Sequence, residues 1–256
     1  EPDSVMPGMS RQLNTWVPRS VARADHVIAV SEATRQDLIE LYGTPAEKIS
    51  VLYHGVASHF RPQTDPACLH RLRQRYGLGE RPFILSVGTI QPRKNFRRLI
   101  QAFARLDPPY TLVIAGGRGW GESDIFAEAV RLGLQDRVHF PGFIADDDLP
   151  ALYSAAELFV YPSLYEGFGL PALEAMACGT PVVASNRSAL PEVVGEAGLL
   201  VDPLDVGAIA GAMAQVLTTP ELRQKLSEAG QRRAAQFTWD GVARQLLALY
   251  YTLLAN

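Results

Sequence analysis

The sequence predicts an α/β protein built around a parallel β-sheet with helices packed against it. From about Phe83 onward, short runs rich in β-branched and aromatic residues alternate with longer segments of helical periodicity, an order that is typical of a parallel sheet. Apolar residues make up 47% of the 256 residues and charged residues 20%, so the chain has enough apolar side chains to fill a core. A chain of this length forms one large domain or two small ones.

Six predicted strands form the main sheet. They are expected at residues 83–88, 110–117, 138–143, 158–163, 181–186 and 198–203. Helices are expected between and after them, at residues 95–106, 123–132, 146–155, 170–177, 190–194 and 205–217. Six strands in this order make a complete Rossmann-like sheet. Asn95 and Ser123 are expected to cap two of these helices, and Asp146, Asp147 and Asp148 to cap a third from solvent.

The first 60 residues predict a smaller unit of the same kind. HVIAV (26–30) and ISVLYHG (49–55) are expected strands, and the helix between them begins after Ser31 and ends at Gly43. One βαβ unit is only a remnant of a second Rossmann-like lobe. We therefore divide the chain into residues 1–60, the main lobe at 61–237 and a terminal helix at 238–256.

The terminal helix has an apolar face that must pack on something. Thr238 is its expected N-cap, and the apolar positions are Val242, Leu246, Leu249 and Leu253. The apolar stretch at 246–255 is about half of the roughly 20 residues that cross a bilayer, so we expect no membrane span. The first ten residues, EPDSVMPGMS, do not have the features of a signal peptide.

Charge, cysteine and histidine content exclude several classes of function. The 24 Lys and Arg against 27 Asp and Glu give a net charge of −3, so nucleic acid is not an expected partner. Cys68 and Cys178 form neither a C-x-x-C pair nor a disulfide framework, which favours the reducing cytoplasm. The histidines have no metal-ligand spacing, and we expect no metal site.

The segment EGFGLPALE (166–174) is the strongest candidate for a binding site. It follows the strand expected at 158–163, and ligands of open α/β sheets bind beyond the carboxyl ends of the strands. Gly167 and Gly169 permit close approach of the backbone, and the helix beginning near Leu170 and Pro171 directs free N–H groups into the cleft. This arrangement predicts an anion site suited to a phosphate.

Two carboxylates flank this anion site. Glu174 lies in the first turns of the helix, where side chains lean toward the N-terminus, and Glu166 precedes the loop. Carboxylates do not bind phosphate, so the pair suits the neutral hydroxyl groups of a ribose or a sugar. Alternatively, Glu174 caps its own helix and Glu166 is a solvated loop residue. The pair, the glycines and the strand-to-helix setting together favour ligand binding.

A second candidate, SVGTIQPRKN (86–95), follows the first strand of the main sheet. Arg93 and Lys94 stand where a helix begins, with Gly88 behind them, so two cations face the same cleft. That arrangement can neutralise a diphosphate. Arg97 and Arg98 lie one turn further along and are expected to be surface charges.

The glycine-rich segment GGRGWGE (116–122) resembles a nucleotide-binding loop but does not meet its requirements. It does not have the G-x-G-x-x-G spacing, the following strand has no acidic residue to hold a ribose, and it is not a P-loop. Gly116 and Gly117 are instead expected to keep the cleft open for a bulky ligand.

Several of these segments resemble one family, the retaining, nucleotide-sugar-dependent glycosyltransferases of group 1, which have the GT-B fold. The resemblance is carried by SVGTIQPRKN, LVIAGGRGW, VHFPGFIADDDLPALY and YPSLYEGFGLPALEAMACGTPVVASN, with the family's signature of Glu, seven residues and Glu. ADHVIAVSEATRQDL and KISVLYHGV are similar to the end of the family's N-terminal lobe. The resemblance implies that residues 1–60 are a remnant of the N-terminal acceptor lobe and linker, that 61–237 are the C-terminal, donor-binding lobe, and that the terminal helix crosses back and exposes an apolar face.

The resemblance also implies roles for particular residues. Glu174 would hold the ribose hydroxyls, Glu166 the hydroxyls of the transferred sugar, and Lys94 the phosphates. The family usually has an arginine where this chain has Thr89, so Arg93 would supply the missing charge. Backbone contacts to the sugar and diphosphate would come from Phe168, Gly169, Leu170 and Pro171, and the base would lie between Phe143 and Ile144.

The mechanism implied by the resemblance retains the anomeric configuration of the donor. The nucleoside diphosphate leaves from the face at which the acceptor hydroxyl arrives, and positive charge stabilises it. Glu166, Lys94 and Arg93 are therefore the expected catalytic residues. No cofactor is expected besides the substrate, a nucleotide-sugar of the GDP-mannose or UDP-glucose type.

The resemblance further implies the setting of the reaction. The PRKN segment is similar to mannosyl- and glucosyl-transferring members, so a hexose, mannose first, is the expected sugar. The acceptor would be a glycan or lipid-linked glycan in polysaccharide or lipopolysaccharide synthesis, in the cytoplasm and at the inner face of the membrane. Self-association through the C-terminal helix is a further expected contact. The alternatives are a non-catalytic nucleotide-sugar-binding module and a GT-B UDP-sugar epimerase, which shares the fold but not the Glu166/Glu174 pair.

Overall fold

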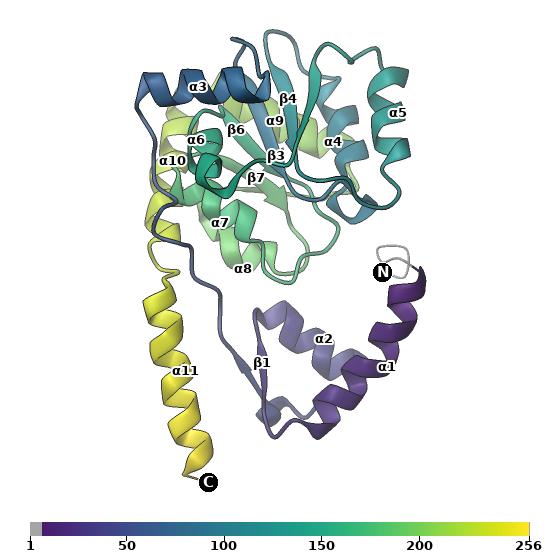
Figure 1. The fold of residues 1–256 in the computed structure, drawn as a ribbon, viewed down its shortest axis with the longest axis vertical. Helices are drawn as coiled ribbons and strands as arrows, with labels where there is room; N and C mark the ends of the chain where they lie inside the picture. The colour runs from purple at the N-terminus through teal and green to yellow at the C-terminus, as the bar shows by residue number, and fades with distance from the viewer. Residues whose placement is uncertain (1–6, 256) are drawn as a thin grey trace.

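The structure is a computed structural model that describes residues 7–255, with side chains described from residue 12 onward. Its main lobe is a six-stranded parallel sheet with the strand order β5-β4-β3-β6-β7-β8 (Figure 1). The strands are β3 (Phe83–Val87), β4 (Thr111–Ala115), β5 (Val138–Gly142), β6 (Leu158–Tyr161), β7 (Val182–Ser185) and β8 (Leu199–Val201). The predicted α/β class and its parallel sheet are confirmed.

Helices cover both faces of this sheet. One face packs against α4 (Phe96–Phe103), α5 (Ser123–Arg131) and α9 (Val206–Thr218). The other face packs against α3 (Pro66–Tyr76), α6 (Leu149–Ser154), α7 (Leu170–Ala177) and α8 (Leu190–Val194), while α10 (Pro220–Ala234) contributes side chains to both. The bounds predicted for α7 and α8 are confirmed at both ends.

Alternation of side chains along each strand explains the two cores. In β3, Phe83 and Leu85 enter one core and Ile84 enters the other, and all three are fully buried. In β6, Phe159 points to the first core and Val160 to the second. A strand that is buried on both faces needs apolar residues at successive positions, which is why these segments are continuous apolar runs.

Two predicted helix caps are wrong. Asn95 has φ 60° and forms no capping bond; its buried side-chain amide donates instead to the carbonyls of Pro162 and Pro203. It therefore ties the loops after β6 and β8 to the start of α4. Ser123 is the first helical residue of α5, and the residue before it, Glu122, makes no capping bond either. The partners of Asn95 lie in distant loops, and the start of α5 lies one residue earlier than a Ser123 cap requires.

The three aspartates form a 3-10 turn, Asp146–Asp148, ahead of α6, and none of them caps a helix. The Asp148 carboxylate accepts hydrogen bonds from the Arg75 guanidinium at 2.8 Å and the Tyr76 hydroxyl at 2.7 Å. For Asp148 the expectation of capping from solvent is wrong because α3 packs beside this turn and supplies these two donors, whereas Asp146 and Asp147 are exposed and make no capping bond.

The N-terminal unit consists of α1 (Pro7–Arg23), β1 (Val27–Ala29), α2 (Glu32–Tyr42) and β2 (Ile49–Val51), with a 3-10 turn at Ala46–Lys48. β1 and β2 pair in parallel, as the βαβ prediction requires. The Ser31 hydroxyl accepts from the N–H of Thr34, and Gly43 ends α2 in the left-handed conformation with φ 63°, so both predicted caps are confirmed. The domain boundaries near residues 60 and 237 stay a prediction.

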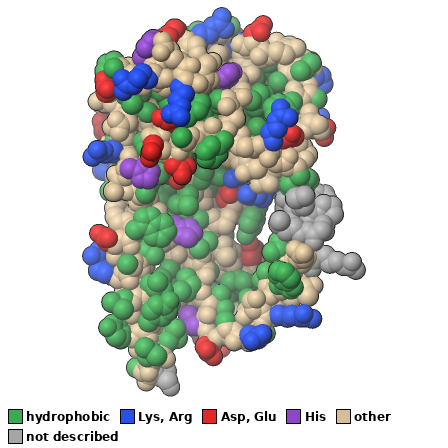
Figure 2. Space-filling view, viewed as in Figure 1, with side chains coloured by type: hydrophobic (Ala, Val, Ile, Leu, Met, Phe, Trp, Pro, Cys, Tyr) green, Lys and Arg blue, Asp and Glu red, His purple; other side chains and the backbone are tan. Residues whose placement is uncertain are grey.

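The N-terminal unit contacts the main lobe through the first turn of α2. Both oxygens of the Glu192 carboxylate, on α8, accept backbone N–H groups of this turn, from Glu32 and Ala33, at 2.7 Å each. The Thr34 hydroxyl donates to the carbonyl of Gly167 at 3.2 Å. The molecular surface is hollowed between the two parts (Figure 2). α2 is therefore attached directly to the loop that precedes α7.

The terminal helix, α11 (Trp239–Leu254), extends away from α10 beside the N-terminal unit (Figure 1). Thr238 caps it by accepting from the N–H of Gly241, as predicted. None of its residues is buried, and apolar side chains gather on it (Figure 2), including Leu247, Tyr250, Tyr251, Leu253 and Leu254. Of the four predicted apolar positions, Leu253 is exposed, whereas Val242, Leu246 and Leu249 are half-buried, so the exposed apolar surface lies mainly on neighbouring residues of the helix. Among residues 7–255, no helix has the length and apolar composition needed to span a membrane.

Candidate functional site

The two candidate segments meet at the centre of the sheet. The 3-10 turn Pro92–Lys94 follows β3, and the loop that leads to α7 follows β6. β3 and β6 are neighbours, and the chain runs outward from them in opposite directions, toward β5 on one side and β8 on the other. This is the topological switch point, where the loops diverge and leave a crevice for a ligand.

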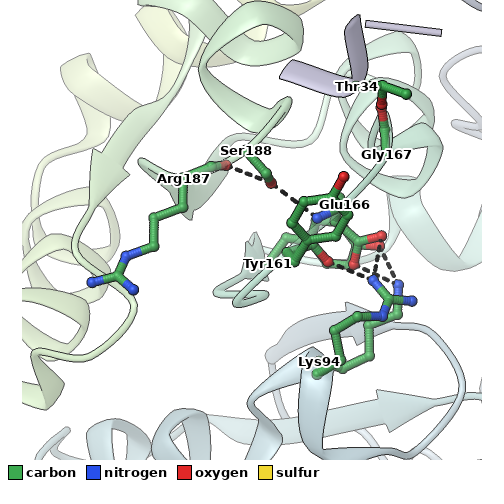
Figure 3. A network of polar contacts seen from close by, with 9 residues as sticks. Thr34, Lys94, Tyr161, Glu166, Gly167, Arg187 and Ser188 are labelled. Carbon is green, nitrogen blue, oxygen red and sulfur yellow. Dashed lines mark hydrogen bonds and ion pairs between the residues drawn. The ribbon is translucent and has the colours of Figure 1, made fainter. Parts of the chain in front are cut away.

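A cluster of three charged side chains occupies this point (Figure 3). Lys94 Nζ lies 2.7 Å from Glu166 Oε1, and Arg93 Nη1 lies 2.8 Å from Glu166 Oε2. Lys94 and Glu166 are each 7% exposed. Arg93 also donates to the carbonyl of Tyr165 at 2.5 Å. The structure thus brings together the three predicted catalytic residues, two from one segment and one from the other.

The cluster has two cations and one anion. Burial lowers the pKa of Lys94, and the nearby charge of Glu166 acts against that decrease. Burial by itself would raise the pKa of Glu166, but the charges of Lys94 and Arg93 and their hydrogen bonds hold it below its ordinary value. With Lys94 and Arg93 both paired to the ionised Glu166, the cluster has a net positive charge of one, next to the N-terminus of α7, which suits an anionic ligand.

The hydroxyl of Tyr161 completes the cluster, and the sequence analysis missed it. Tyr161 ends β6 and is fully buried; its hydroxyl accepts a hydrogen bond from Lys94 Nζ at 2.5 Å. The Lys94 ammonium also lies 4.8 Å from the centroid of the Tyr161 ring. A tyrosine at the carboxyl end of an otherwise apolar strand was an available signal, because a buried tyrosine hydroxyl needs a partner.

Ser188 orients the segment that carries Glu166, and the sequence analysis missed it too. The N–H of Glu166 donates to Ser188 Oγ at 2.9 Å, and the Ser188 hydroxyl donates to the carbonyl of Arg187 at 2.7 Å (Figure 3). Ser188 has φ 52°, which is uncommon for a residue with a side chain. No sequence pattern pointed to this contact, because Ser188 reaches Glu166 from a different βα connection.

Gly169 shapes the turn into α7. It has φ 116°, and a Cβ there would lie 2.6 Å from a methyl group of Leu190. Both the backbone conformation and this contact require glycine. The helix begins at Leu170, with Pro171 in its first turn.

Glu174 lies on the second turn of α7 and has a different set of partners. Its Oε2 accepts a hydrogen bond from the Tyr153 hydroxyl at 2.8 Å. Burial raises its pKa above the ordinary value, and the Tyr153 hydrogen bond acts in the opposite direction. Glu174 does not cap its own helix.

Comparisons with known proteins identify the family. The sequence model described as "Glycosyl transferases group 1" matches residues 70–233, and one described as "Glycosyltransferase Family 4" matches residues 4–60. The first match covers more than half of the chain. The chain belongs to the group 1 glycosyltransferases.

Relatives and solved structures support this assignment. The chain is 40% identical over 248 residues to O-antigen chain mannosyltransferase B of Escherichia coli, covering 95% of this chain and 65% of the relative. It is 35% identical over 241 residues to the serotype-specific mannosyltransferase WbdA of E. coli, covering 91% of this chain and 29% of WbdA. The chain thus spans less than two thirds of the length of either relative.

The structure of Anabaena HepE in complex with UDP-glucose superposes with a TM-score of 0.86 at 29% identity. The match covers 98% of this chain and 70% of HepE. This likeness extends over both the main lobe and the N-terminal unit, and confirms the predicted GT-B fold.

The glycines of the candidate site are required for different structural reasons. A Cβ on Gly88 would lie 3.0 Å from Lys94 Cε, so this glycine makes room for the lysine side chain. A Cβ on Gly116 would lie 2.1 Å from the carbonyl oxygen of Gly88. Gly116 therefore permits close packing of backbone, and the expectation that it keeps a cleft open is wrong. Gly117 has open space around it, and Thr89 is exposed.

Two further predictions for this group 1 site concern the base. Phe143, directly after β5, is 73% exposed, so its ring is available for stacking. Ile144 is 3% exposed and belongs to the core, so its side chain cannot flank a ligand and only its backbone can face one. The prediction that Ile144 flanks the base therefore concerns its backbone, and it stays a prediction.

Phe168 likewise faces the protein. Its ring is 4% exposed and lies 6.0 Å from Tyr53, 5.2 Å from His54 and 6.0 Å from Phe237, centroid to centroid. The side chain therefore packs the loop before α7 onto Tyr53 and His54, which belong to the linker between β2 and α3, residues 52–65. The backbone of Phe168 is the part left to contact a ligand. A Cβ on Gly167, beside it, would lie 3.9 Å from both Thr34 Oγ1 and Val30 Cγ2, so this glycine faces the N-terminal unit.

Arg97 and Cys178 also have defined surroundings. Arg97 is exposed and pairs with the buried carboxylate of Glu128 at 3.5 Å. Cys178 is buried at the end of α7. Within the part of the chain that the structure describes, no three His, Cys, Asp or Glu residues are grouped as metal ligands.

Proposed function

We propose that this chain is the donor-binding part of a retaining glycosyltransferase that transfers a hexose from a nucleotide-diphospho-sugar. The observation that supports the proposal is the pair of cations, Lys94 and Arg93, which share the single carboxylate of Glu166 at the switch point. As the bond to the sugar breaks, negative charge develops on the leaving diphosphate. Preorganised positive charge and a helix N-terminus stabilise that charge without reorganisation.

Glu166 also has the capacity to contact the transferred sugar. An ionised carboxylate has about four acceptor sites, and Lys94 and Arg93 use one on each oxygen. The Tyr161 hydroxyl is also hydrogen-bonded to Glu166, and the acceptor sites that remain can accept hydroxyl groups of a hexose. Glu174, whose Oε2 has one partner, can accept the hydroxyls of a ribose.

The donor and acceptor are proposed from the relatives. The two E. coli relatives are named mannosyltransferases, and HepE is bound to UDP-glucose. We therefore propose mannose as the first sugar to test, GDP-mannose or a UDP-glucose-type nucleotide-sugar as the donor, and a glycan or lipid-linked glycan as the acceptor. A cytoplasmic protein at the inner face of the membrane, acting without a cofactor, fits this reaction.

Calorimetry with UDP-, GDP- and ADP-sugars tests the proposal. One donor class is expected to bind, and Lys94→Ala and Glu174→Ala to weaken that binding by about 100-fold and about tenfold, since hydrogen bonds to charged groups contribute about 1.5–3 kcal/mol. Lys225→Ala and Glu221→Ala, exposed on α10, are the matched controls and should bind as the unchanged chain does. Unchanged affinity in both site variants would contradict the proposal.

A further inference from the structure

Tyr153 is a buried tyrosine whose hydroxyl has one partner, the carboxylate of Glu174. The residue lies on α6, and its side chain is fully buried. Its hydroxyl donates to Glu174 Oε2 at 2.8 Å. A tyrosine hydroxyl in an apolar core needs such a partner, whereas a phenylalanine ring would fill the same space without needing one. Packing alone therefore does not account for the hydroxyl of Tyr153.

The Tyr153 ring is held in place on several sides. It packs edge-on against Phe159 of β6 at 5.5 Å and against Phe60 of the linker at 6.1 Å, between ring centroids. The backbone carbonyl of Tyr153 accepts from the Thr180 hydroxyl, just after α7, at 2.7 Å. The hydroxyl thus has a fixed position relative to α7, the helix that carries Glu174.

A glutamate side chain has several rotatable bonds, and a carboxylate that receives two hydroxyls must hold one orientation. A hydrogen bond from a rigid donor to one oxygen selects that orientation before the ligand arrives. Tyr153 uses one acceptor site of Oε2 and leaves the second site and the whole of Oε1. The geometry can therefore orient Glu174 without occupying it.

We propose that Tyr153 is a positioning residue for ribose recognition, acting through the orientation of the Glu174 carboxylate. The proposal rests on the proposed function, because it requires Glu174 to accept the ribose hydroxyls. It adds a residue from α6, outside both candidate segments, to the determinants that distinguish ribonucleotides from nucleotides without these hydroxyls.

The electrostatic surroundings of Glu174 provide a second readout. Burial raises its pKa and Asp146 adds to the increase, whereas the Tyr153 hydrogen bond and the charge of His59 lower it. Cys178, at the end of the same helix, has a pKa raised to about 12 by burial and stays a neutral thiol. Removing the Tyr153 hydroxyl removes a contribution that lowers the carboxyl pKa, so the pKa of Glu174 should rise.

The experiment compares Tyr153→Phe with the unchanged 256-residue chain in calorimetric titrations. The probes are GDP and UDP, each beside its 2′,3′-dideoxy analogue. Tyr153→Phe is expected to lower the affinity for whichever of GDP and UDP binds by about fivefold, which corresponds to the loss of one hydrogen bond. The affinity for the dideoxy analogue should stay unchanged. The affinity for the ribonucleotide falls in acid as Glu174 is protonated, and in Tyr153→Phe this fall should occur at a higher pH. Tyr53→Phe, which removes a hydroxyl bonded to Glu192, is the control and should alter neither.

Three outcomes would overturn the inference. Equal weakening of the ribonucleotide and its dideoxy analogue would mean that Tyr153 only supports packing, and an unchanged preference for the ribonucleotide would mean that Glu174 needs no orientation. If Tyr153→Phe does not fold, Glu174→Asp is the second variant, because its shorter side chain keeps the charge but moves it away from the Tyr153 hydroxyl. Full retention of the preference for the ribonucleotide over its dideoxy analogue in that variant would overturn the inference.

The same titrations separate this inference from the proposed function. If Glu174→Ala loses the preference for the ribonucleotide while Tyr153→Phe keeps it, only the role of Tyr153 is wrong. If the unchanged chain and Glu174→Ala both bind the ribonucleotide and the dideoxy analogue equally, the ribose contact itself is wrong.

Discussion

Glu166 and Glu174 lie on either side of one helix N-terminus, yet their surroundings are opposite. Glu166 contacts two cations, and its pKa lies below the ordinary value. Glu174 is hydrogen-bonded to the neutral hydroxyl of Tyr153, and its pKa lies above that value. Both carboxyls are largely removed from water. The comparison teaches that burial alone does not decide the charge of such a group; its partners do.

The two carboxylates therefore have opposite effects on folding stability. A lowered pKa means that the ionised form of Glu166 stabilises the folded chain above the ordinary glutamate pKa, and that this contribution is lost as pH falls through the folded pKa. A raised pKa means that ionised Glu174 destabilises the folded chain near neutral pH, and that acid relieves this effect. Substituting each residue by its neutral isostere tests the contrast directly.

Glu166→Gln is expected to have the largest effect. It leaves Lys94 and Arg93 facing each other without a counter-charge, and removing one partner of a buried ion pair lowers the free energy of unfolding by about 3 kcal/mol. Urea denaturation near neutral pH measures this loss, which should shrink in acid. Glu228→Gln, in an exposed pair with Arg232, is the matched control and should change stability by less than about 0.5 kcal/mol. A loss as small as the control's would contradict the contrast.

Tyr161→Phe is expected to have an intermediate effect. It removes the hydroxyl that accepts from Lys94 Nζ, and a hydrogen bond to a charged group contributes about 1.5 kcal/mol or more. The same denaturation experiment measures the loss. Because Lys94 keeps its ion pair with Glu166, the decrease should be smaller than for Glu166→Gln. The reverse order would mean that the tyrosine, not the carboxylate, holds the lysine in place.

Glu174→Gln is expected to have the smallest effect and the opposite sign. It should raise the free energy of unfolding near neutral pH by about 0.5 kcal/mol, as other substitutions that relieve a functional site do, while nucleotide affinity falls. The gain should disappear in acid, where the carboxyl is protonated in both the folded and unfolded chain. Thermal denaturation near neutral pH and in acid measures this change in stability, with Glu221→Gln as an exposed control. A loss of stability near neutral pH would contradict the raised pKa.

Much of the fold could be predicted because it depends on local patterns. The strands were recognisable as apolar runs since each is buried on both faces, and the start of α7 was predictable because Gly169 and Pro171 mark it. The caps at Ser31 and Thr238 follow from a hydroxyl just before a helix. Asn95 was misread because its partners lie in two distant loops.

The candidate site was predictable in its charged residues and not in their partners. Arg93, Lys94, Glu166 and Glu174 stand in two short segments whose position after strands already indicates a site. Tyr153, Tyr161 and Ser188 come from other elements and reach the site only when the sheet forms.

The amino-acid sequence by itself determined the α/β class, the group 1 resemblance and the chemical character of the site, because residue type and spacing along one segment decide these. Only the tertiary structure decided which carboxylate pairs with cations and which with a tyrosine. The reason is physical: the charge of a buried group depends on distances of a few ångströms to atoms that are remote in sequence, and the order of strands in the sheet sets those distances.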